Sequence, residues 1–299
     1  MHSNVDPYLD AYNHLTMSLY RINNILVPID LSESSLKALE TAVIIAKRHN
    51  AFVQLLHVEE NSFDDYEDIS QSHFVSPGNA IDVINALLAA IHHTHGIKPE
   101  LLQKEGNVSD NIIRASFLYH SDLIVMGAHG ASGFREGFIG NNTYNVIKYA
   151  ACPVLSVPHK KNSISFDKIL FPIRPVSGAL MPYSIVSYFT QPKTVIEVFG
   201  LSYRIVETGT AVLDTLVNEI KGQLEKDRVL SKVVWSEGST IADEILKYSN
   251  KVNPDLIVLT AALDATSKSK YIGPHAQKII HCSKTSVLSI KKIGIPSFA

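Results

Sequence analysis

Internal repetition is the feature of this sequence that most limits its fold. Three short segments recur later in the chain in the same order, which indicates two copies of one domain. A length of 299 residues suffices for two domains of about 140–150 residues, each with its own core. The repeated pairs are Asn24–Asp30 with Lys168–Arg174, Asp122–Gly127 with Asp255–Thr260, and Val154–Val157 with Val287–Ile290.

The repeats also set the expected boundaries. We predict a flexible extension over residues 1–20, a first domain over 21–158 and a second domain over 164–292, with the polar stretch His159–Ser163 between the domains. The first copy is longer because polar residues that include Asp64–Asp68 follow its second strand, and these are typical of a solvated loop.

Within each copy, short apolar runs alternate with segments of helical period, a pattern typical of βαβ units. The expected fold class is therefore α/β, with an open five-stranded parallel sheet and helices on both of its faces in each domain. The strands of the first copy are expected near 23–29, 51–58, 99–105, 122–127 and 153–157. Helical stretches of the second copy include Ser184–Phe189, Ala211–Leu224 and Ile241–Tyr248. The expected helix starts of the first copy are Ser32 or Ser34, Asn79, Ser109 or Asp110, and Asn141 or Asn142.

Composition argues against several classes of function. A formal net charge of −2 offers no strongly basic surface for nucleic acid or anionic lipid. No apolar run approaches the roughly 18–20 residues of a membrane span, and the first residues lack a signal peptide, so we expect a cytoplasmic protein. Cys152 and Cys282 are too few for a disulfide framework, and we interpret both as small buried residues.

Neither catalytic residues nor metal ligands are predicted. His92 and His95 are three residues apart, but their segment resembles a helix end, where histidines interact favourably with backbone carbonyls. The sequence has no Gly-x-x-x-x-Gly-Lys-Ser/Thr loop and no evident pair of nucleophile and base. Whether the protein is an enzyme is therefore left open, with a binding protein favoured.

A glycine-rich segment after the fourth strand predicts a phosphate site. It contains Gly127-Ala-His-Gly130, then nine residues, then Gly140-Asn-Asn-Thr143 at a helix start. Glycines allow positive φ and a close approach of backbone to phosphate, and the amides of a helix N-terminus carry about half a positive charge. In open α/β sheets, ligands bind beyond the carboxyl ends of the strands, where this segment would lie.

These segments resemble the universal stress protein family. The loop is similar to that family's ATP-binding motif, Val27–Asp30 with the serines that follow resembles its opening strand, and Leu56-His57-Val58 resembles its second strand end. Gly106 and Cys152–Leu155 match its third-strand turn and last strand. The resemblance spans nearly the whole chain, twice, and implies two tandem adenine-nucleotide α-hydrolase-like domains.

The resemblance also implies a ligand and its contacts. It implies binding of ATP, AMP or ADP, with magnesium as a companion ion, by the first domain. The implied site residues are Pro28, Ile29, Asp30, Val58, Met126, Gly127, His129, Gly130, Gly140, Asn141, Asn142 and Thr143.

Both copies depart from the family pattern. Asn141 stands where nucleotide-binding members carry Ser or Thr. The second copy departs further, with Arg174 in place of Asp30 and Thr260 in place of Gly127. Leu263 replaces Gly130 there, and only Gly273, followed by Pro274, remains of its loop glycines. We therefore predict no ATP site in the second domain.

Three functions are compatible with the sequence. The first is a stress or signalling sensor that binds adenine nucleotide, the second a nucleotide-free interaction module, and the third a slow ATP-hydrolysing enzyme. The two domains are expected to pair within the chain as a pseudo-dimer through Cys152–Val157 and Thr285–Ile290, since exposed sheet edges invite strands. A homodimer of chains is left open, and neither nucleic acid nor membrane is an expected partner.

Overall fold

The computed structural model describes residues 20–60, 77–128, 141–158, 165–175, 179–180, 182–202, 207–237, 240–260 and 272–291. Its contacts divide the chain into two compact units. One unit is Asn23–Lys160, and the other is Lys161–Ala299 together with the residues before Asn23. Tyr20 belongs to the second unit, where its ring lies edge-on to Tyr188 with 5.9 Å between the ring centroids.

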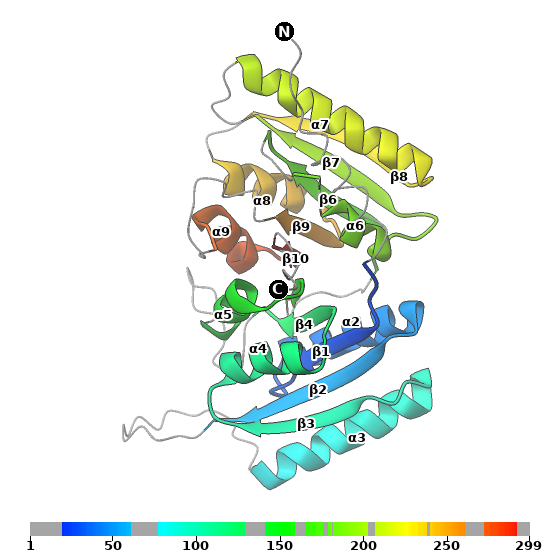
Figure 1. Cartoon of the computed structure of the whole chain (residues 1–299), viewed down its shortest axis with the longest axis vertical. Coiled ribbons are helices and arrows are strands. Elements are labelled where there is room, and N and C mark those ends of the chain that lie inside the picture. Colours follow the sequence, from blue (N-terminus) through cyan, green and yellow to red (C-terminus); the bar gives the residue numbers. More distant parts are fainter. Residues whose placement is uncertain are drawn as a thin grey trace, which may run out of the picture. The chain divides into compact units, whose positions relative to one another are not determined.

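The first unit is a parallel α/β sheet with the strand order β3-β2-β1-β4-β5. In Figure 1, α4 and α5 lie on one face of this sheet and α2 lies on the other. The arrangement confirms the α/β prediction and the five expected strands. The elements are β1 (Asn24–Pro28), α2 (Glu33–His49), β2 (Phe52–Glu59), α3 (Pro77–His95), β3 (Glu100–Glu105), α4 (Val108–Leu118), β4 (Leu123–Gly127), α5 (Asn141–Tyr149) and β5 (Val154–Val157).

The second unit repeats this topology with the order β8-β7-β6-β9-β10, again all parallel. The three helical stretches expected for it are present. Its elements are β6 (Lys168–Ile173), α6 (Tyr183–Val186), the 3₁₀ turn η1 (Ser187–Phe189), β7 (Val195–Leu201), α7 (Glu207–Lys226), β8 (Leu230–Ser236), α8 (Ile241–Val252), β9 (Leu256–Thr260), α9 (Pro274–Cys282) and β10 (Ser286–Ile290).

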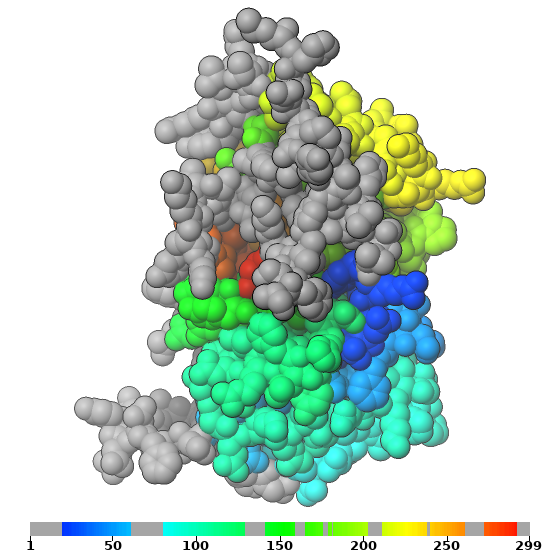
Figure 2. All heavy atoms as spheres, viewed as in Figure 1, coloured from blue at the N-terminus to red at the C-terminus, as the bar shows by residue number. Residues whose placement is uncertain are grey.

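Both cores are built on central strands that are buried on both faces. Leu123–Met126 of β4 and every residue of β9 are buried, as expected for parallel strands covered by helices on each side. Helices supply the outer surface, and in Figure 2 the atoms of α4 and α5 form much of the visible face of the first unit. None of the helices in the described ranges combines the length and apolar character needed to cross a bilayer.

The structure corrects several local predictions. Ser32 caps α2 as expected, but α3 begins at Pro77, so Asn79 lies inside this helix. The cap of α4 is Asn107, whose side chain accepts from the amide of Asp110, so this helix begins at Val108, one or two residues earlier than predicted.

Two further expectations are corrected by burial and backbone geometry. Cys282 is exposed and Cys152 is half-buried, so neither is a core residue. Among the described glycines, Gly96 and Gly106 have positive φ, and Gly127 does not. The need for glycine at position 127 therefore has another cause.

That cause is the packing of α2 against the end of β4. A Cβ atom at position 127 would lie 2.5 Å from the Oγ and 2.9 Å from the Cβ of Ser34. In the second unit the described residues of the β6–β7 connection form only the single turn α6 and η1, in place of the 17-residue α2. The second unit therefore lacks, among its described residues, a long helix like α2 beside this strand end, and it has Thr260 where the first unit requires Gly127.

A repeated aspartate joins the first and fourth strands of each unit. The Oδ2 atom of Asp122 accepts from the amides of Asn23 and Asn24 at 2.8 and 2.9 Å, and the Asp122 amide donates back to the Asn24 carbonyl at 2.8 Å. In the second unit, Oδ2 of Asp255 accepts from the Lys168 amide at 3.0 Å, and the Asp255 amide donates to the Lys168 carbonyl at 2.8 Å. The repeated aspartate therefore has a structural role.

We expect Asp122→Ala to lower the free energy of unfolding by about 1–3 kcal/mol, because two amides at the start of β1 lose their acceptor. Urea unfolding of the full chain, followed by circular dichroism, measures the change. Asp82→Ala, at an exposed position of α3, is the control and should stay within about 0.5 kcal/mol of wild type. Equal stability of the two variants would contradict the structural role.

We also expect Gly127→Ala to destabilise the first unit by about 1–3 kcal/mol, because the new methyl group overlaps Ser34. The matched control is Gly222→Ala in α7, where an added Cβ meets nothing within 4 Å. Alanine favours a helix, so the control should be neutral or up to about 1 kcal/mol more stable. Thermal unfolding of both variants checks the difference, and a Gly127→Ala protein as stable as wild type would disprove the overlap.

Candidate functional site

The candidate site lies where the strand order of the first unit reverses. The chain leaves β1 toward β2 on one side, and β4 pairs with β1 on the other side, so a crevice opens beyond the ends of β1 and β4. A pocket of about 540 Å³ occupies this crevice. Its volume is in the usual range for small-molecule and cofactor sites.

Most of the predicted site residues line this one pocket. They are Pro28, Ile29, Asp30, Val58, Met126, Gly127, Asn141, Asn142 and Thr143. The other three, His129, Gly130 and Gly140, lie outside the described residues.

Sequence reasoning missed one wall of the pocket. Asn107, Val108, Ser109 and Ile112 of the α4 region line it, as do Glu60 and Asn145. The available signal was topological, because the N-termini of helices that follow parallel strands all lie at the same end of the sheet. The serines after β1 and Leu56, which the family resemblance had included, also line the pocket.

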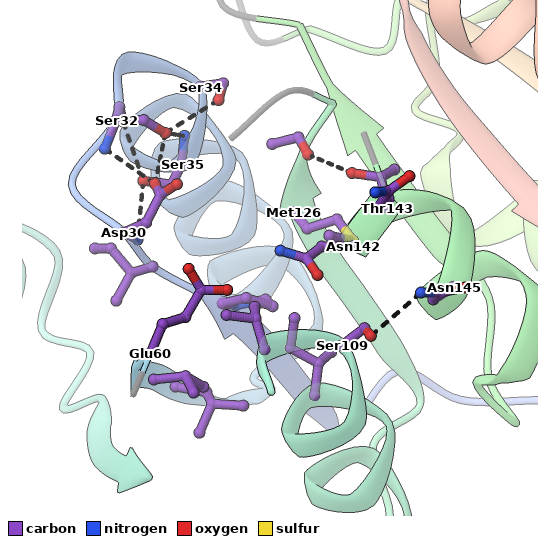
Figure 3. A pocket seen from close by; sticks show the side chains of 18 of the residues that line it. Asp30, Ser32, Ser34, Ser35, Glu60, Ser109, Met126, Asn142, Thr143 and Asn145 are labelled. Carbon is purple, nitrogen blue, oxygen red and sulfur yellow. Dashed lines mark hydrogen bonds between the residues drawn. The ribbon is translucent and has the colours of Figure 1, made fainter. Parts of the chain in front are cut away.

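The end of β1 is held by a compact network (Figure 3). Oδ1 of Asp30 accepts from the amide of Ser32 at 3.0 Å and from its hydroxyl at 2.5 Å. The Ser32 hydroxyl in turn accepts from the Ser35 amide and lies 3.2 Å from the Ser34 hydroxyl. Leu31 between them has φ of 62°, an uncommon backbone conformation for a residue with a side chain. This turn places the N-terminus of α2 at the pocket.

Three helix N-termini therefore meet around the pocket. The α2 helix begins after the cap Ser32, α4 begins after the cap Asn107, and α5 begins at Asn141. The Thr143 hydroxyl lies 3.3 Å from the Gly127 carbonyl oxygen and ties α5 to the end of β4. Each helix N-terminus carries about half a positive charge, so together they favour an anionic group.

The second strand presents backbone groups to the same pocket. The pairing of β1 with β2 ends at Pro28 and Leu56, with one further bond from the Ile29 amide to the Leu56 carbonyl. The carbonyl of Glu59 faces β3, where it accepts from the amide of Gly106. Because backbone groups alternate along a strand, those of Val58 face the opposite side, where β1 has already ended.

The charged side chains that line the described part of the pocket are both acidic. They are Asp30 and Glu60, and the described lining contains neither lysine nor arginine. Around them the lining combines apolar side chains, such as those of Ile112 and Met126, with serine, threonine and asparagine. The pocket thus combines an apolar slot, lined by side chains such as Ile112 and Met126, with neutral hydrogen-bond donors from serine, threonine and asparagine.

The corresponding region of the second unit differs in shape. Phe199 pairs with Pro172 as Leu56 pairs with Pro28, so it takes the place of Leu56. It is buried and stacks on Tyr248 of α8 with 4.7 Å between the ring centroids. Burial, followed by the neighbouring Glu197, raises the pKa of Tyr248 to about 12, so this phenol stays neutral. An aromatic pair therefore stands where the first unit has Leu56.

The helix N-termini of the second unit also differ. Proline at position 274 begins α9, so the first residue of this helix has no amide to donate. Lys278 lies 2.6 Å from Asp243, and this hydrogen bond, followed by one from Thr240, holds the pKa of Asp243 below its usual value. Leu263 lies outside the described residues.

The described residues contain no group of three metal-ligating side chains. His92, His93 and His95 lie in the last turn of α3, at the helix end that the sequence indicated. Their position is that of favourable partners for helix C-terminal carbonyls.

Known proteins resemble about half of this chain in sequence. A family model described as the universal stress protein family matches residues 21–158. A universal stress protein of Bacillus subtilis is 30% identical over 148 residues, which cover 45% of this chain and 98% of the relative. A universal stress protein of Methanocaldococcus jannaschii is 30% identical over 151 residues, which cover 48% of this chain and 85% of the relative.

Solved structures extend the likeness to both units. A universal stress protein from Archaeoglobus fulgidus matches with a TM-score of 0.70 at 22% identity, covering 92% of this chain and 100% of that chain. A putative universal stress protein from Pseudomonas aeruginosa matches with a TM-score of 0.64 at 17% identity, covering 93% and 95%. These structures establish the fold, and the sequence relatives establish the lineage: the chain belongs to the universal stress protein family.

Proposed function

We propose that the first unit binds an adenine nucleotide, with ATP as the leading candidate, in the pocket at the ends of β1 and β4. The observation that carries this proposal is the meeting of three helix N-termini around one pocket with an apolar slot. A nucleotide combines the two matching parts, a flat base and an anionic phosphate chain.

The base would lie against the ends of β1 and β2. Ile29, Leu56, Val58 and Ile112 supply apolar surface there. The Val58 amide and carbonyl face this space, and a neighbouring donor and acceptor can pair with N1 and the 6-amino group of adenine. Guanine has the reverse pattern of donor and acceptor at these positions, so the backbone of β2 favours adenine.

The phosphates would lie at the N-terminus of α5. Asn141 and Asn142 begin this helix and are exposed at the pocket, with Thr143 buried behind them. The family motif adds three residues to this proposed phosphate site, namely the loop glycines Gly130 and Gly140 and the imidazole of His129. A magnesium ion fits this site because Asp30 adds negative charge to that of the phosphates. When bound, the ion would neutralise phosphate charge.

The proposed role of the protein is that of a cytoplasmic stress or signalling sensor. Nucleotide occupancy of the first unit would carry the signal, and the second unit would act as its structural or regulatory partner. Two features of the second unit support this asymmetry. The stacked pair of Phe199 and Tyr248 stands where the first unit has Leu56, and the proline that begins α9 removes one donor.

We expect the full chain to bind one ATP in the presence of magnesium, with micromolar affinity, about −8 kcal/mol. Asn141→Pro tests the proposed phosphate site, because proline is well accepted at the first position of a helix and removes the backbone amide there together with the side-chain carboxamide of Asn141. The second unit carries Pro274 at the same position of α9. Loss of one hydrogen bond to a phosphate should weaken binding roughly tenfold or more, as measured by isothermal titration calorimetry.

The matched control is Pro274→Ala, which restores an amide in the second unit and should leave ATP affinity unchanged. Circular dichroism would confirm that both variants fold. Unchanged affinity in a folded Asn141→Pro protein would place the phosphates elsewhere, and a wild-type chain that binds no adenine nucleotide would overturn the proposal.

A further inference from the structure

We infer that the carboxylate of Glu60 binds the 2′ and 3′ hydroxyl groups of the ribose in the bound nucleotide. This contact makes the site selective for ribonucleotides. This inference rests on the proposed function and adds to it a residue that determines which sugar is accepted. Glu60 lies directly after β2 and lines the pocket.

The carboxylate of Glu60 differs from several polar groups of the pocket, including the carboxylate of Asp30, in having no hydrogen-bond partner within the described residues. Asp30 is bound by Ser32, Ser109 donates to Asn107, and the Thr143 hydroxyl lies against the Gly127 carbonyl. Within the described part of the chain, Glu60 has neither a hydrogen bond nor an ion pair. It therefore presents a charged acceptor that is available to a ligand.

The position of this carboxylate corresponds to the middle of a nucleotide. Figure 3 shows the Glu60 side chain directed into the pocket, between the end of β1 at Asp30 and the start of α5 at Asn142. The proposed base site lies at the ends of β1 and β2, and the proposed phosphate site lies at the start of α5. Since the sugar joins base and phosphate in every nucleotide, a group between these two sites faces the sugar.

Hydrogen-bond chemistry selects the same part of the ligand. At neutral pH the phosphates of ATP are essentially acceptors, so a carboxylate repels them. The donors of ATP are the 6-amino group, which the Val58 carbonyl would bind, and the 2′ and 3′ hydroxyls of the ribose. A carboxylate has two acceptor oxygens and can accept from both hydroxyls of such a pair.

The test is a cycle of two ligands and two proteins. Calorimetry with magnesium would compare ATP with 2′-deoxy-ATP on wild type and on Glu60→Gln. We expect wild type to prefer ATP roughly tenfold, because one charge-assisted hydrogen bond is lost with the deoxy ligand. In Glu60→Gln this preference should fall to threefold or less. The ratio cancels any general change in the charge of the pocket, which affects both ligands alike.

Glu59→Gln is the matched control, because it makes the same charge change at the neighbouring residue, which is exposed and does not line the pocket. It should keep the wild-type preference. An equal preference in wild type and Glu60→Gln would overturn the inference, as would a Glu60→Gln effect confined to the magnesium dependence, which would make Glu60 a cation ligand. Both results leave ATP binding intact, whereas failure of wild type to bind ATP would overturn the proposed function and this inference together.

Discussion

The joining of the first and fourth strands by one aspartate is the constraint on which the site depends. The ladder between β1 and β4 is short, with Ile25 opposite Leu123 and Leu26 opposite Ile124. Asp122 extends it by accepting from two amides at the start of β1. This register brings Asp30 and Gly127 to the same end of the sheet, where the strand order reverses. A slip by one residue would move every side chain of the strand to the opposite face of the sheet.

The two units share one sheet topology but differ at the ends of their strands. This is possible because the residues that hold the topology are not the residues that surround the site. Asp255 repeats the contact of Asp122 with the first strand, so the topology is kept in the second unit. The site depends instead on what surrounds the strand ends. In the first unit, Gly127 admits the N-terminus of α2 beside β4, whereas the second unit has Thr260 there and a single-turn helix in its first connection.

The sequence predicted the elements well because buried parallel strands appear in the sequence as apolar runs, and the repeat identified the first, fourth and fifth strands in both copies. It predicted helix starts less well, since several neighbouring residues can act as caps and only the path of the chain selects Asn107 over Ser109. The α4 wall of the pocket depends on packing across the sheet, which no local motif encodes. Gly127 was identified correctly as a special position, but its cause is the contact with Ser34 and not a positive φ.

The central claim is that one nucleotide site exists and that it lies in the first unit. Amide chemical-shift mapping by NMR, on the full-length ¹⁵N-labelled chain titrated with magnesium ATP, tests this most directly. The account predicts large shifts for Asp30, Val58 and Asn142, with little change at Arg174 and Thr260 in the second unit. Shifts centred on the second unit, or spread equally over both, would contradict it.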